Sequence, residues 1–379
     1  MINNTAISLA KKNGKVLAQF NHQAIKANAK PKKARKKTRI LSIDGGGIRG
    51  IVPATILAHL EKRIQQKTNQ PDARLSDYFD LVAGTSTGGI LGCFYLMPDS
   101  KNPDRPKLTA QETLEIYFKF GKNVFTQSFL RKLVYRLGLV KEKFSARPMN
   151  NTLKKLFGKK LKLSQLIKPC LITTYNKEEE CPMIYHSLAA WENKVNDVKV
   201  WQLARATSAA SQYYKPAVIR LENGVTKTLI DGSIFAQSPA MCAYDFTRRR
   251  PFLTSKNASN QQGCLSVEEV IMVSIGTGVV KQRPDFKKVG KKVDLRWIKS
   301  IIGLMKNGSS KRVDSKLKKI LSEEASNNHY FRLAPKLHEA SPELDNTTPK
   351  NLQALHRDGL QYIDENYDML EQLVDTLIH

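Results

Sequence analysis

The stretch DGGGIRG (residues 44–50) and the stretch GTSTGG (residues 84–89) decide the fold. Each follows a short apolar run, RILSID before the first and DYFDLVAG before the second. Each also leads into a segment whose apolar residues favour a helix, at 51–67 and at 90–97. A strand, a tight glycine turn and a helix, repeated, are typical of α/β proteins. The sequence therefore predicts an α/β fold with a central, mostly parallel sheet flanked by helices.

The rest of the chain extends this pattern. Residues 105–165 favour helices, and residues 351–378 read as one amphipathic helix with a leucine-rich face. No Pro/Gly/Ser linker divides the chain, so we expect a basic N-terminal arm over 1–38 and one domain over 39–379. The strands that we predict cover residues 39–44, 77–84, 170–176, 226–231 and 270–278.

Charge is the unusual bulk property. Lys and Arg number 62 against 34 acidic residues, a net charge of +28, which favours polyanionic partners. The segment KPKKARKKTR (30–39) is either a polybasic patch or a solvated leader. Nucleic acid is not expected as a partner, because the sequence contains no zinc spacing, helix-turn-helix or RNA-binding aromatic motif.

Cysteines and apolar runs bear on the compartment. The five cysteines are scattered without a CxxC pair, which favours free thiols in a reducing compartment. The first thirty residues lack a signal-peptide pattern, and no window approaches 18 uninterrupted apolar residues. We therefore expect a cytoplasmic protein.

Ser86 is the candidate nucleophile. Gly84-Thr85-Ser86-Thr87-Gly88 matches G-x-S-x-G and stands between a predicted strand and a predicted helix. A nucleophile elbow at such a strand–helix turn needs small neighbours, and the helix N-terminus favours developing negative charge. The alternative is a glycine-rich packing turn without chemistry.

The glycine run at Gly45, Gly46 and Gly47 is the candidate anion site. Consecutive glycines let backbone amides converge on a phosphate or on the oxyanion of an acyl intermediate. The run does not match the P-loop pattern or a complete dinucleotide-binding pattern, so the oxyanion reading is favoured. Arg49 would then brace the loop or attract an anionic head group.

Asp231 is the candidate base. The seven histidines stand in contexts typical of surface or packing residues. Asp231 instead ends a predicted strand and is followed by Gly232. Partial burial would raise the pKa of its carboxyl group and so improve the match to a serine hydroxyl.

Four segments in this order resemble the patatin-like phospholipase family: DGGGIRG, GTSTGG, the Asp-Gly at 231–232 and SIGTG at 274–278, with ARATSAASQYYKP (204–216) as a further likeness. The resemblance implies a Ser86–Asp231 dyad and an oxyanion hole from Gly45–Gly47. It also implies hydrolysis of acyl esters in glycerophospholipids, release of free fatty acids, and no metal or other cofactor. The residues implied to support the site are Asp44, Arg49, Gly84, Gly88 and Gly232. The chain departs from the common family pattern at Ser211-Gln212, Ser233 and Gln237-Ser238.

A narrower resemblance concerns regulation. The stretch MCAYDF (241–246) and the cytosolic character resemble the bacterial CapV-type effectors of cyclic-nucleotide antiphage systems. That likeness implies activation by a cyclic dinucleotide. A homo-oligomer is a further expectation. The alternatives are a constitutive, non-specific lipid acyl hydrolase without nucleotide control and, less favoured, a basic nucleic-acid-binding protein.

A membrane contact is expected at LRWIKSIIGLMK (295–306), where Trp297, Ile298 and Ile301 accompany Lys299. Such a basic, amphipathic segment suits the headgroup layer of an anionic membrane, and the enzyme would lie peripherally at the inner membrane when active. Packing on the catalytic core is the alternative reading, and the segment 129–144 has the same ambiguity.

Overall fold

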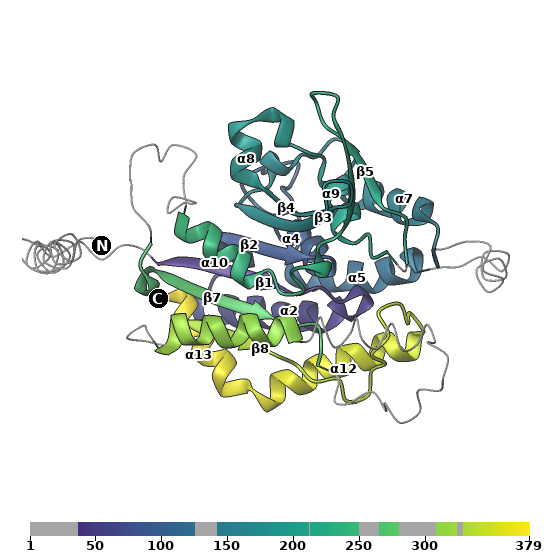
Figure 1. The fold of residues 1–379 in the computed structure, drawn as a ribbon. Helices are drawn as coiled ribbons and strands as arrows, with labels where there is room; N and C mark the ends of the chain where they lie inside the picture. The colour runs from purple at the N-terminus through teal and green to yellow at the C-terminus, as the bar shows by residue number, and fades with distance from the viewer. Residues whose placement is uncertain (1–36, 126–141, 212, 250–264, 280–307, 324–328) are drawn as a thin grey trace, which may run out of the picture. The chain divides into compact units, whose positions relative to one another are not determined.

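The computed structural model describes residues 37–125, 142–211, 213–249, 265–279, 308–323 and 329–379. The chain divides into two compact units, residues 1–37 and 38–379. The first unit lies outside the described residues except for Lys37, so the fold below is that of the second unit. Figure 1 shows its elements.

Eight strands form one sheet in the part of the chain that the structure describes. The strand order is β5-β6-β3-β2-β1-β7-β8, and β4 pairs with β3 outside that path. The pairs β1–β2, β1–β7, β2–β3 and β7–β8 are parallel, while β3–β4, β3–β6 and β5–β6 are antiparallel. The predicted central, mostly parallel sheet is therefore confirmed. The strands are β1 (Thr38–Ile43), β2 (Leu81–Thr85), β3 (Cys170–Asn176), β4 (Cys181–His186), β5 (Ala217–Arg220), β6 (Thr226–Asp231), β7 (Val270–Ile275) and β8 (Tyr330–Leu333).

The α-helices cover both faces of this sheet. Their bounds are α2 (Ile51–Thr68), α3 (Leu75–Tyr78), α4 (Thr87–Leu96), α5 (Ala110–Val124), α7 (Ala146–Phe157), α8 (Ser187–Glu192), α9 (Val200–Thr207), α10 (Ala240–Arg249), α12 (Pro349–Glu365) and α13 (Tyr367–Ile378). Short 3-10 turns include η1 (Gly47–Gly50), η2 (Leu163–Gln165), η3 (Lys194–Asn196), η4 (Gly232–Ile234) and η5 (Val267–Glu269), and η7 (Lys319–Glu323) is a π-helical turn.

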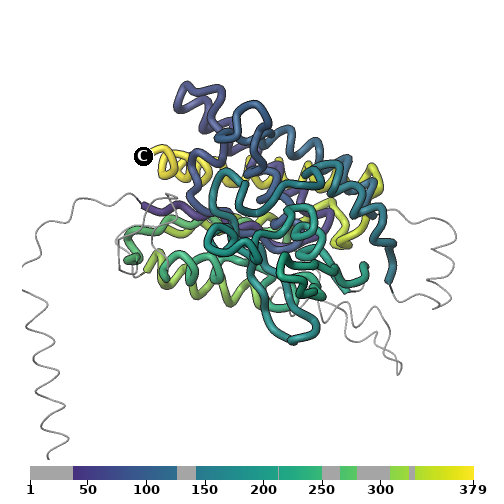
Figure 2. Tube along the Cα trace, turned by 90° about the horizontal axis from the view of Figure 1, so that it is seen from above, coloured from purple at the N-terminus to yellow at the C-terminus, as the bar shows by residue number. Residues whose placement is uncertain are grey.

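Alternation along the central strands explains the two helical layers. In β1, Leu41 and Ile43 join the larger apolar core, whereas Ile40 joins the smaller one. Successive side chains of a strand point to opposite faces, so a strand that is buried along nearly its whole length, as β1 is, must be covered on both sides. The larger core includes residues of α2, α12 and α13, and the smaller one includes residues of α10. Figure 2 shows α12 and α13 on one side of the strands and α10 on the other.

One edge of β3 sets the position of the site. β4 pairs with residues 171–176 of β3 and therefore occupies one edge over that whole length. β2 pairs with residues 170–173 and β6 with residues 174–176, so both share the opposite edge. Since β2 is parallel and β6 antiparallel to β3, the two strands run toward each other. Their carboxyl ends meet there.

Several expectations need correction. The second strand begins at Leu81 rather than at residue 77, because residues 75–78 form α3. The tail is two helices rather than one: Asn366 leaves the helical conformation, and its Nδ2 donates to the carbonyl of Tyr362 at 2.8 Å. This side-chain bond replaces a backbone bond and ends α12. Strands β4, β5 and β8 were not predicted.

Candidate active site

Ser86 stands on a sharp turn between β2 and α4. Its φ of 55° and ψ of −120° lie in a left-handed region that costs a non-glycine residue about 1–3 kcal/mol. Its amide donates to Oγ1 of Thr207 at 2.8 Å, and its carbonyl accepts the Ile90 amide at 3.1 Å. The side chain is 7% exposed. The surrounding hydrogen bonds thus hold a strained serine at the start of a helix, as the predicted elbow requires.

Gly84 and Gly88 permit this turn because backbone passes very close to both. A Cβ at Gly88 would lie 2.1 Å from the carbonyl oxygen of Ile43, at the end of β1. A Cβ at Gly84 would lie 2.4 Å from the carbonyl of Gly88. Neither position can take a side chain without moving backbone that also carries the site. Both residues therefore support the elbow by close approach.

Asp231 ends β6 and caps the short turn η4. Its Oδ1 accepts the amide of Ser233 at 2.8 Å, and its own amide donates to the carbonyl of Ala209 at 3.2 Å. The residue is 5% exposed. A Cβ at Gly232 would lie 2.3 Å from Oγ1 of Thr173, which explains the glycine after the carboxylate. The backbone around Asp231 is therefore fixed against β3.

The strand ends bring Ser86 and Asp231 together. Thr85 pairs with Thr173 of β3, and Asp231 pairs with the next residue, Thr174. Consecutive residues of a strand advance by about 3.3 Å, so the two strand ends are neighbours. Oγ1 of Thr85 also bonds Oγ1 of Thr173 at 2.7 Å and donates to the Ala236 carbonyl at 2.8 Å. The candidate nucleophile and base thus emerge from one junction in the sheet.

The glycine loop has two backbone amides without a protein acceptor among the described residues: those of Gly46 and Gly47. By contrast, the amide of Gly45 donates to the Gln237 carbonyl at 3.0 Å. The Ile48 amide likewise donates to the Leu344 carbonyl at 2.9 Å. Gly46 is buried and Gly47 half-buried, and buried amides are almost always paired, so an unpaired amide beside Ser86 marks a place for an anion. The expected donor set is corrected accordingly, since the Gly45 amide is occupied.

Asp44 fixes the start of the loop through a partner that the sequence did not reveal. Its carboxylate pairs with Arg332 of β8, with Nη2 to Oδ2 at 2.6 Å and Nη1 to Oδ1 at 3.2 Å. Burial acts to lower the pKa of Arg332, but the Asp44 charge outweighs it and the pKa is raised. Nη1 of Arg332 also donates to Oγ of Ser274 at 2.7 Å. This bidentate pair ties the loop to β7 and β8.

Arg49 is half-buried and reaches from the glycine loop to the segment that follows β7. Its Nη1 donates to the carbonyl of Gly278 at 3.5 Å. Burial lowers the pKa of the guanidinium to about 10, so it still carries its charge at neutral pH. Of the two expected roles, bracing the loop agrees with this contact.

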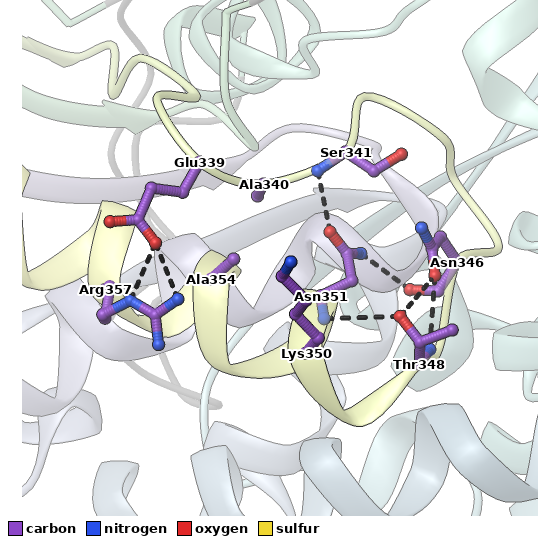
Figure 3. A pocket seen from close by; sticks show the side chains of 9 residues that line it. All are labelled: Glu339, Ala340, Ser341, Asn346, Thr348, Lys350, Asn351, Ala354 and Arg357. Atoms are coloured by element: carbon purple, nitrogen blue, oxygen red, sulfur yellow. Dashed lines mark hydrogen bonds and ion pairs between the residues drawn. The ribbon is translucent and has the colours of Figure 1, made fainter.

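A polar hollow of about 470 Å³ lies at the start of α12 and is lined by residues between 339 and 357. Figure 3 shows Asn351 clasping the loop that precedes α12: Oδ1 accepts the Ser341 amide at 2.7 Å and Nδ2 donates to the Asn346 carbonyl at 2.7 Å. The same loop supplies the Leu344 carbonyl to Ile48. The lining of the hollow contains neither Ser86 nor Asp231. We therefore assign it to loop support rather than to an acyl chain.

The histidines were expected to be surface or packing residues. His186 caps α8 through Nδ1, and Nδ1 of His356 bonds Oγ1 of Thr55 at 3.0 Å, so both have local structural contacts. Within the described ranges no group of three His, Cys, Asp or Glu side chains could hold a metal ion. No helix in those ranges is both long and apolar enough to cross a bilayer. The predicted membrane residues Trp297, Ile298, Lys299 and Ile301 lie outside the described residues.

Known proteins resemble this chain over most of its length. A family model described as "Patatin-like phospholipase" matches residues 41–244. "Patatin-like protein 2" from Oryza sativa subsp. indica is 28% identical over 361 residues, covering 91% of this chain and 88% of that protein. "Probable inactive patatin-like protein 9" from Arabidopsis thaliana is 29% identical over 289 residues, covering 74% and 71%. The solved structure "Human GIVD cytosolic phospholipase A2" matches with 11% identity and a TM-score of 0.41, covering 99% of this chain and 65% of that one.

Proposed function

This chain belongs to the patatin-like phospholipase family and is a lipid acyl hydrolase, and we propose that it works through a Ser86–Asp231 dyad. One relative is named as probably inactive, so the proposed dyad rests on the residues of the site and not on the likeness to relatives. The observation that carries it is the junction on β3, where Thr85 and Asp231 oppose the consecutive residues Thr173 and Thr174. Asp44 also follows a strand at this end of the sheet, but its carboxylate is held in a bidentate pair with Arg332.

In the acylation step, Oγ of Ser86 attacks the ester carbonyl carbon of a glycerophospholipid while Asp231 accepts the hydroxyl proton. The carbonyl oxygen becomes an oxyanion, which the amides of Gly46 and Gly47 stabilise as hydrogen-bond donors. The intermediate then expels the lysophospholipid alkoxide, which takes the proton from Asp231. The products of this half-reaction are a lysophospholipid and an ester between the fatty acyl group and Ser86.

Deacylation repeats the same geometry with water. Asp231 accepts a proton from a water molecule as its oxygen attacks the acyl carbon, and the same two amides stabilise the second oxyanion. Collapse breaks the bond to Oγ of Ser86, which regains a proton from Asp231. A free fatty acid leaves, and the enzyme returns to its starting state. No cofactor takes part in either step.

The test is fatty-acid release from phospholipid vesicles together with labelling by a fluorophosphonate, which reacts with activated serines. We expect wild-type protein to release fatty acid and to be labelled at Ser86. Ser86→Ala should lose both signals and Asp231→Asn should lose at least the turnover, with circular dichroism unchanged. Labelling at another serine, or turnover by Ser86→Ala, would refute the proposal.

We propose that the substrate is met at an anionic membrane surface. Two strongly exposed apolar side chains support this: Ile234, 61% exposed, follows Asp231 by three residues, and Val279, 40% exposed, follows Thr277 by two. Apolar side chains that are exposed together as a patch mark protein or membrane contact sites, and these two follow closely in sequence on the base Asp231 and on Thr277, which bonds the glycine loop. The net charge of +28 favours anionic lipid. The membrane contact predicted at residues 295–306 remains a separate prediction.

Vesicle binding separates this contact from catalysis. Ile234→Asp should weaken binding to anionic vesicles and slow their hydrolysis, while hydrolysis of a short, soluble ester stays within about twofold of wild type. Leu360→Asp is the matched control, because Leu360 is 44% exposed on α12, away from the site. Equal effects of both substitutions on vesicle binding would contradict the proposed surface.

We further propose control by a cyclic dinucleotide in antiphage defence, with a homo-oligomer as the active form. The resemblance of residues 241–246 and the excess of basic residues support this part. Vesicle hydrolysis and light scattering, each with and without a panel of cyclic dinucleotides, test it. Full turnover without nucleotide would favour the constitutive alternative.

A further inference from the structure

Gln237 and Thr277 both donate hydrogen bonds to the carbonyl oxygen of Gly45. Nε2 of Gln237 is one donor, and Oγ1 of Thr277 is the other at 2.7 Å. The backbone carbonyl of Gln237 in turn accepts the Gly45 amide at 3.0 Å. All three bonds are buried or nearly so, since Gln237 is 9% and Thr277 4% exposed. One glycine is therefore held on both of its backbone polar groups.

The Gly45 carbonyl belongs to the same peptide unit as the Gly46 amide. A trans peptide is planar, so its C=O and N–H point in opposite directions. Two donors on the oxygen fix the plane of that unit and thereby the direction of the Gly46 N–H. They also polarise the unit, because hydrogen bonds in a chain strengthen one another by roughly 10–30%. Gly46 is one of the two amides left without a protein acceptor.

The packing around this peptide leaves little freedom. A Cβ at Gly46 would lie 2.2 Å from Oγ1 of Thr277, so the loop lies flat against that side chain. A Cβ at Gly45 would lie 3.3 Å from Cβ of Ser86, which places the same peptide beside the nucleophile. The peptide is thus confined between Thr277 on one side and Ser86 on the other.

We propose that Gln237 and Thr277 are positioning residues that orient and polarise the Gly46 amide for the oxyanion. The inference rests on the proposed function and deepens it. Gln237 lies in the segment that begins with Asp231. The carbonyl of the neighbouring Ala236 accepts a hydrogen bond from Oγ1 of Thr85. One segment therefore links the base, the elbow and the oxyanion loop.

The test compares Gln237→Ala, Gln237→Glu and the control Ser238→Ala on a soluble ester. Ser238 is a good control because it is the next residue, is 3% exposed, and its hydroxyl contacts no polar partner in the described residues. Loss of one oxyanion donor typically costs about 10²–10³ in turnover, so loss of its orientation in Gln237→Ala should cost about 10- to 100-fold in kcat. KM should stay within about threefold, and Ser238→Ala should match wild type.

A pH profile distinguishes positioning from a merely structural role. In Gln237→Glu a carboxylate presents only lone pairs to the Gly45 carbonyl, whereas the protonated acid has an O–H to donate. The turnover of this variant relative to wild type should therefore rise as pH falls from about 8 to about 5. Thr277→Ser, which keeps the hydroxyl, should retain activity that Thr277→Val loses.

A trifluoromethyl ketone, which forms an oxyanion adduct with serine, gives the last readout. Its inhibition constant should increase in Gln237→Ala by about the factor lost in kcat. The positioning role would be overturned if Gln237→Ala kept the wild-type kcat and the turnover of Gln237→Glu relative to wild type did not change with pH. The dyad would remain intact in that case. Turnover by Ser86→Ala would instead overturn the proposed function itself, so the two failures are distinguishable.

Discussion

Gly88→Ala is the most informative single change to the elbow. The new methyl carbon would lie 2.1 Å from the carbonyl oxygen of Ile43, whereas ordinary van der Waals contact begins at 3.4 Å. The start of α4 and the end of β1 must then separate by about 1.3 Å. Ser86 precedes α4 and the glycine loop follows β1, so the separation falls between the nucleophile and the oxyanion donors.

A misplacement of about 1 Å can cost about 10²-fold in rate, so kcat should fall about 100-fold in Gly88→Ala. Overpacking of this kind also destabilises by about 1–3 kcal/mol, which leaves a domain of this size folded. The assay is turnover of a soluble ester, read together with the urea midpoint of unfolding.

Two matched variants accompany this measurement. Gly92→Ala adds the same methyl one turn later in α4, where it would meet only the Val82 side chain at 3.0 Å. Gly308→Ala adds it where nothing lies within 4 Å. Both should keep kcat within about threefold of wild type. If Gly88→Ala folds and turns over normally, or if Gly92→Ala loses as much activity, the close-approach argument is wrong.

Three further changes test the support around the site. Arg332→Met should destabilise the fold by about 3–5 kcal/mol in urea, because it leaves the Asp44 charge buried and unpaired, and Asp44→Asn in the same chain should recover most of the loss. Glu371→Gln should lower Tm by about 2–4 °C at pH 7. Hydrogen bonds and charge from its basic partners on α2 hold the pKa of Glu371 at about 2 in the folded state, below its unfolded value. The stabilisation is therefore present above pH 4.5 and is lost as pH falls through 2. An equally large effect of the substitution at pH 2 would contradict this. Asp358→Ala should cost about 2–4 kcal/mol, since the carboxylate accepts three backbone amides at 3.1 Å, and an unchanged urea midpoint would show that these bonds are dispensable.

The local part of the site could be predicted from sequence. Ser86 follows an apolar strand, Asp231 is the last residue of another strand, and small residues mark both turns. Strand, turn and helix are set by residues close in the chain, so β3 and β6 were predicted with their observed bounds. The pattern of glycines likewise identified the loop that carries the two unpaired amides.

The long-range part could not be predicted. That β2 and β6 share one edge of β3 depends on pairing between residues far apart in the chain, which no local pattern records. Arg332 lies in YFRL, a short strand with no glycine or charge pattern to mark it. A buried Asp44 does demand a partner, but its identity follows only from β8 pairing with β7. The sequence pattern predicts the Gly45 amide as an oxyanion donor, because no local pattern reveals that this amide donates to the Gln237 carbonyl.

The dyad is tested most directly by the turnover of Ser86→Ala, Asp231→Asn and the double variant, measured on one soluble ester with folding verified for each. Groups that act as one unit are not additive, so each single change and the double change should lose the same factor, about 10³ or more. Asp231→Asn with more than about a tenth of wild-type turnover, or a double variant whose loss is the product of the two single losses, would contradict a shared catalytic step.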